Sequence, residues 1–117
     1  MNIYDDEHKI LSIFNRKRCL LFFLQRIPNG LEVSLNRFTG VRTIARIEVT
    51  DELEIQSTIK CCRGRAKVVA IKDKKIFLIN ECTQKENTAT AKLEKGIYRL
   101  RVVGDKTDSI VKVEKNQ

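Results

Sequence analysis

Apolar and polar side chains alternate one for one through most of this sequence, in short runs that end at turn residues. In residues 53–60 every apolar side chain stands at an odd position, together with Ser57, and the even positions are all polar. A second run places Tyr98, Leu100 and Val102 on either side of arginines. Successive Cβ atoms of a strand point to opposite sides, so a strand buried on one face has this period of two. The pattern predicts an all-β protein.

Turn residues divide the chain into about ten candidate strands. The clearest turn is Pro28-Asn29-Gly30, because proline presets φ and glycine accepts a positive φ. Many short strands at regular spacing are typical of an antiparallel sandwich or a barrel. After residue 30 the predicted strands are residues 31–37, 41–49, 53–61, 66–72, 75–81, 88–93, 97–103 and 109–114.

The N-terminal segment has a different pattern. Residues 66–71 are apolar at both alternations, so Val69 and Ile71 need cover on a second face. The apolar residues of segment 1–26 are the best candidates, and we expect the run 20–24 to be buried. A hairpin of residues 10–14 and 19–25 is favoured over a helix across residues 3–17, although acidic residues begin that helix and basic residues end it.

The length of 117 residues fits one domain, residues 1–117, with a covering segment at 1–26 and a sandwich at 31–114. Exchange of the covering segment with a second copy would make a homodimer. The inward phase of the alternation predicts a core of Ile47, Val49, Leu53, Ile55, Val68, Leu78, Tyr98, Leu100 and Val102.

Net charge and cysteine content bear on the binding partners and the cellular compartment of the protein. There are 23 lysine and arginine residues against 15 acidic ones, a net charge of +8 that favours anionic partners but also serves solubility. Asp5, Asp6 and Glu7 have the wrong sign for a secretion signal, and residues 20–24 are too short for a membrane span. Four cysteines do not form a disulfide framework and agree with a reducing compartment. We expect a cytoplasmic protein.

Residue types that support catalysis or metal binding are scarce. His8 is the one histidine, so a Ser-His-Asp or Cys-His site has no base. No Cys-x-x-Cys pair offers zinc ligands, and no glycine-rich loop offers a phosphate cradle. We therefore expect no enzyme activity, no metal and no cofactor.

Basic residues form the strongest candidate site for an anionic partner. Arg63, Arg65 and Lys67 share one strand face, and Arg99 and Arg101 share another. If these strands are neighbours, the five cations form a patch that contacts phosphates. Single-strand binders also stack bases on exposed aromatic rings, and no aromatic residue interleaves with these arginines.

Three stretches carry a resemblance. They are residues 38–44, residues 64–71 and residues 93–104, the last with a turn at Lys95-Gly96 that leads into a strand ending at Gly104. Together they resemble a group of small bacterial β-sandwich proteins of the jelly-roll, lectin-like type, over residues 31–114. The resemblance implies a jelly roll shaped like a carbohydrate-binding module, and it assigns no functional residue.

The prediction is therefore an antiparallel β-sandwich of jelly-roll type, with an N-terminal hairpin or short helix packed on it. Its expected function is a non-enzymatic binding or interaction module for a protein or a saccharide. The alternative is a nucleic-acid-binding protein that uses the basic strand face.

Overall fold

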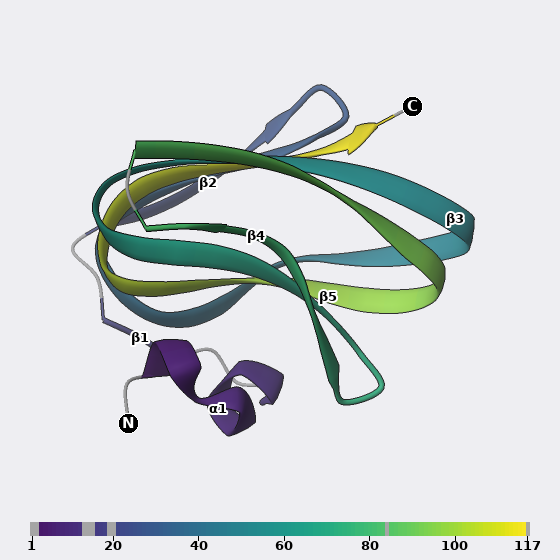
Figure 1. The fold of residues 1–117 in the computed structure, drawn as a ribbon, viewed down its shortest axis with the longest axis horizontal. Coiled ribbons are helices and arrows are strands. Elements are labelled where there is room, and N and C mark those ends of the chain that lie inside the picture. Colours follow the sequence, from purple (N-terminus) through teal and green to yellow (C-terminus); the bar gives the residue numbers. More distant parts are fainter. Residues whose placement is uncertain (1–2, 13–15, 19–20, 84, 117) are drawn as a thin grey trace.

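The computed structural model describes residues 3–12, 16–18, 21–83 and 85–116. Strands make up most of this chain, and its two helical elements are short (Figure 1). In chain order the elements are η1 (Ile3–Asp5), α1 (Glu7–Leu11), β1 (Arg16–Arg18), β2 (Leu21–Ile27), β3 (Gly30–Lys72), β4 (Lys75–Cys82) and β5 (Lys85–Asn116).

Backbone pairing arranges these strands in two facing layers (Figure 1). The first layer consists, in spatial order, of β2, then residues 30–36, 109–116, 53–61 and 85–94. The second consists of β1, then residues 38–49, 96–107, 65–72 and β4. All neighbours are antiparallel, and the segments of β3 and β5 alternate between layers, as in a jelly roll. The predicted antiparallel sandwich is confirmed.

The strands expected within residues 31–72 join into β3, and those expected within residues 88–114 join into β5. They join because paired strands bend together. Val49 pairs with Gly96 and Leu53 with Leu93, so β3 and β5 leave one layer for the other at the same place. Gly64 makes a second bend at φ +69°, where a Cβ would lie 2.3 Å from the carbonyl oxygen of Asp105. Only glycine fits this approach without strain.

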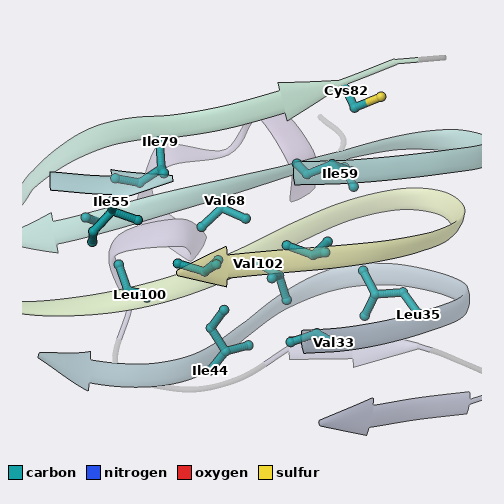
Figure 2. Packing of buried hydrophobic residues seen from close by; sticks show 14 of the residues in the cluster. Val33, Leu35, Ile44, Ile55, Ile59, Val68, Ile79, Cys82, Leu100 and Val102 are labelled. Carbon is teal, nitrogen blue, oxygen red and sulfur yellow. The ribbon is translucent and has the colours of Figure 1, made fainter. Parts of the chain in front are cut away.

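The main core lies between the two layers (Figure 2). Six of the predicted core residues are buried, namely Val49, Ile55, Val68, Tyr98, Leu100 and Val102, while Ile47 and Leu53 are partly buried. The prediction for Leu78 is wrong, since its side chain is 57% exposed and Ile79 is buried instead. A bulge between Val68 and Val69 shifts the register, so Val68 pairs with Asn80 and Val69 pairs with Leu78.

A second, smaller core lies on the outer face of the second layer. Tyr4 and Ile10 pack there against Val69, Ile71 and strand neighbours from β3 and β5. The N-terminal segment is therefore the cover that Val69 and Ile71 required. Its form corrects the favoured hairpin, because Ile3–Asp5 and Glu7–Leu11 are helical. The Asp6 carboxylate accepts a hydrogen bond from the backbone N–H of Lys9 at the start of α1. Residues 13–14 and 19–20 of the predicted hairpin lie outside the described residues.

Strand β2 forms one edge of the first layer. It pairs with residues 30–36 through the predicted Pro28-Asn29 turn, in which Asn29 has φ 63°. Phe22 packs partly against the main core, but Phe23 and Leu24 are 53% and 43% exposed. The expected burial of the run 20–24 is therefore wrong for these two residues. Phe23 pairs with Ser34 and faces away from the core, and Leu24 belongs to an edge strand. Residue 20 lies outside the described residues.

Candidate functional site

The five basic residues predicted as a site come from neighbouring segments. Val69 pairs with Arg101 and Ile71 with Arg99, so the segments that carry the cations lie side by side in the second layer. The N-terminal segment covers this face. The Arg101 guanidinium is fully buried and donates to the carbonyl oxygens of Ile10, at 2.8 Å, and Ser12.

Arg99 completes this contact by donating to the carbonyl oxygens of Leu11, at 2.9 Å, and Ser12, at 3.3 Å. The two arginines thus bind the carboxyl end of α1, where unpaired carbonyls attract cations. Burial, assisted by the charge of Arg99, lowers the pKa of Arg101 to about 10.

Arg65 and Lys67 contact the other end of the same segment. The Arg65 guanidinium lies 3.2 Å from both Asp5 and Asp105, and both cations face the ring of Tyr4, at 4.1 Å and 4.3 Å from its centroid. Arg63 is exposed and lies 3.9 Å from Asp108. Four of the five predicted cations therefore hold the N-terminal segment in place.

Two clefts open between the layers, one on the side of β4 and one on the side of β2. The first, here called the Phe77 cleft, has a volume of about 400 Å³. Three lysines, two carboxylates and two aromatic rings line it together with one leucine: Lys72, Asp73, Lys75, Phe77, Lys92, Leu93, Glu94 and Tyr98.

The aromatic pair gives the Phe77 cleft a fixed wall. Phe77 lies near the start of β4, is 40% exposed, and meets Tyr98 edge-on with ring centroids 6.1 Å apart. The Tyr98 hydroxyl donates to the carbonyl oxygen of Glu94 at 2.8 Å. Lys72 donates to the carbonyl oxygen of Lys95 at 2.7 Å. The wall is thus held by both β3 and β5.

Sequence reasoning missed Phe77 as a site residue. The available signal was the pair Phe77-Leu78, two large apolar neighbours of which a strand can bury only one. The register decides which of them reaches the cleft: Phe77 pairs with Ala70, on the core side, and Leu78 pairs with Val69, on the outer side.

The second cleft, here called the Leu31 cleft, has a volume of about 570 Å³. Its lining is mostly aliphatic with no aromatic ring, and it consists of Leu24, Arg26, Ile27, Asn29, Gly30, Leu31, Ile44, Ala45, Arg46, Ile47, Leu53, Ile55, Leu100, Val113, Glu114 and Lys115. The two clefts therefore differ in the chemistry they present.

Among the described residues, no group of three or more His, Cys, Asp and Glu side chains is placed to hold a metal ion. None of the described helices has the length and apolar character needed to cross a membrane. Cys61 and Cys82 are buried, and Cys62 is exposed.

Comparisons with known proteins find similarity only at the level of solved structures. No family model matches the sequence, and no curated protein matches it. The carbohydrate binding module CBM6cm-2 of Cellvibrio mixtus lichenase 5A, in complex with cellotriose, is 8% identical, with a TM-score of 0.47 over 87% of this chain and 91% of that one. A family 29 carbohydrate binding module is 9% identical, with a TM-score of 0.43 over 87% of this chain and 74% of that one.

Proposed function

We propose that this protein is a non-enzymatic binding module whose ligand is a saccharide held in the Phe77 cleft. The observation that carries the proposal is the exposed ring of Phe77, fixed edge-on by Tyr98 beside charged side chains. Pockets of this kind combine an apolar wall with a few polar groups that fix the orientation of a ligand.

The chemistry of the lining fits a sugar ring. The C–H face of a pyranose is apolar and packs on an aromatic ring, while its hydroxyls need both donors and acceptors around the edge. Lys75 and Lys92 supply donors, and the carboxylates of Asp73 and Glu94 supply acceptors. All four are exposed, so they reach a ligand without a change in the fold.

A panel of soluble polysaccharides in affinity electrophoresis, followed by calorimetry on any that retard the protein, tests the proposal. Phe77→Ala should weaken binding at least about tenfold, as expected for an aromatic anchor. Leu78→Ala is the matched control, because Leu78 is the next residue, is more exposed, and belongs to the opposite face of β4. Binding by the control should equal that of the unaltered protein.

Failure of every polysaccharide to bind, or equal losses in the two variants, would contradict the proposal. The same assays with single-stranded and double-stranded oligonucleotides examine the alternative, in which the basic residues bind nucleic acid. Binding that weakens steeply with salt and is lost in Arg63→Glu, but not in Phe77→Ala, would favour the alternative.

A further inference from the structure

The Leu31 cleft reaches inward as far as the main core. Ile44, Ile55 and Leu100 belong to the main core, yet they form the floor of this cleft. Figure 2 shows these three side chains in the space between the layers. Leu31 and Ile47 are partly buried at the cleft walls. The result is a deep aliphatic groove whose volume of about 570 Å³ suits a small ligand.

Two cations flank the mouth of the groove. Arg26 comes from β2 and Lys115 from β5, and both are exposed. They pair with Leu31 and Ile55, which face the space between the layers, whereas Arg46 pairs with Arg99 on the outer face. Within the described part of the chain, no ion pair engages Arg26 or Lys115. The one carboxylate at the mouth belongs to Glu114, which lies 3.7 Å from Lys112. The mouth therefore carries an uncompensated positive charge.

We propose that the Leu31 cleft binds a long-chain carboxylate, with its acyl chain on the aliphatic floor and its carboxylate at Arg26 and Lys115. The lining has no aromatic ring for stacking a sugar, and its single carboxylate, that of Glu114, lies 3.7 Å from Lys112. An apolar chain gains about 0.8 kcal/mol for each buried methylene, and guanidinium groups match a carboxylate with paired hydrogen bonds. This inference is independent of the Phe77 cleft.

Three probes separate the contributions of chain and charge. Dodecanoate, titrated calorimetrically below the concentration at which it forms micelles, should bind at one site per protein molecule. Dodecanol has the chain without the charge and should bind more weakly, while butyrate has the charge without the chain and should show no saturable binding. Stronger binding of dodecanol than of dodecanoate would overturn the role given to the cations.

Substitutions then locate the site. Arg26→Glu with Lys115→Glu should weaken dodecanoate binding at least about tenfold, because charge-assisted hydrogen bonds are lost and like charges are introduced, and should leave dodecanol binding unchanged. Lys60→Glu is the control for charge, since Lys60 is exposed on the outer face of the first layer. Ala45→Phe, at the cleft wall, should weaken both long-chain probes.

Each variant is checked by thermal unfolding, and the charge variants keep the test decisive if Ala45→Phe fails to fold. Equal weakening by Lys60→Glu would show nonspecific attraction to a basic protein and overturn the proposal. Dodecanoate binding that survives both mouth substitutions would do the same. Since Phe77→Ala does not touch this cleft, its effect on polysaccharide binding is a separate result.

Discussion

Tyr4 is one of the residues that hold the N-terminal segment on the sandwich. Its side chain is 1% exposed, and its hydroxyl donates a hydrogen bond to the carboxylate of Glu81. The cationic groups of Arg65 and Lys67 lie over its ring. Burial raises the pKa of Tyr4 well above its ordinary value, and the hydrogen bond to Glu81 raises it further. This role could not be predicted from the sequence pattern, because the partners of Tyr4 lie more than sixty residues away along the chain.

Alkaline pH should therefore weaken the fold through Tyr4. The unfolded chain releases this proton near pH 10, while the folded chain keeps it, so stability falls as pH rises above 10, by up to about 1.4 kcal/mol per pH unit. Urea unfolding at pH 8 and pH 11 should show a larger loss for the unaltered protein than for Tyr4→Phe. The lowered pKa of Arg101 acts in the opposite direction, and it is common to both proteins. Equal losses would contradict the prediction.

Among the elements, the N-terminal helical segment was predicted from the sequence pattern in its position but not in its form. The doubly apolar run 66–71 correctly required a cover for Val69 and Ile71. It did not specify the form of the cover, because α1 has five residues and is held by arginines from β5 that bind its last carbonyls. Helices this short depend on tertiary contacts rather than on their own periodicity.

Deletion of residues 1–12 tests that dependence. The loss should destabilise the protein by several kcal/mol, since Tyr4 and Ile10 alone each contribute about 1.5–3 kcal/mol on burial and Arg101 becomes exposed. Urea unfolding or loss of solubility measures the effect. Phe23→Ser is the control, because Phe23 is also near the N-terminus but is 53% exposed. A deletion variant as stable as the control would show the segment to be an appendage.

The β-bulges explain the remaining errors at this scale. The core predicted from alternation includes Leu78 and omits Ile44, whereas Leu78 is exposed and Ile44 is buried. Register shifts lie at both places, between Val68 and Val69 and between Thr43 and Ala45. A bulge inserts one residue, which moves the following side chains to the other face of the strand. A strict period of two does not predict where a bulge occurs.

At the scale of the whole molecule, β3 and β5 contribute segments to both layers. Because the same strands run through both layers, we expect that neither layer can unfold without the other. The same arrangement explains why the clefts were not predicted: residues 72–77 and 92–98 meet at the Phe77 cleft only because two long strands change layers. Sequence periodicity predicted the sandwich, whereas a cleft depends on how far one layer extends beyond the other.

A substitution in either layer should consequently weaken both. Leu35→Ala in the first layer and Leu100→Ala in the second should each cost about 2–5 kcal/mol, and each should leave a single unfolding transition. Hydrogen exchange followed by mass spectrometry should show faster exchange in peptides of both layers for both variants. Leu78→Ala should change neither layer. Faster exchange confined to the altered layer would contradict the shared architecture.

The place of residues 109–116 between residues 30–36 and 53–61 has a consequence for the order of synthesis. Translation makes those two outer segments first, and they cannot pair with each other across the missing strand. The apolar faces of the nascent chain therefore stay exposed to solvent until residues 109–116 leave the ribosome. Such exposure favours chaperone binding. A ribosome that stalls before this point would release a chain with no complete first layer, so premature stop codons as late as residue 108 should yield aggregates rather than a smaller domain.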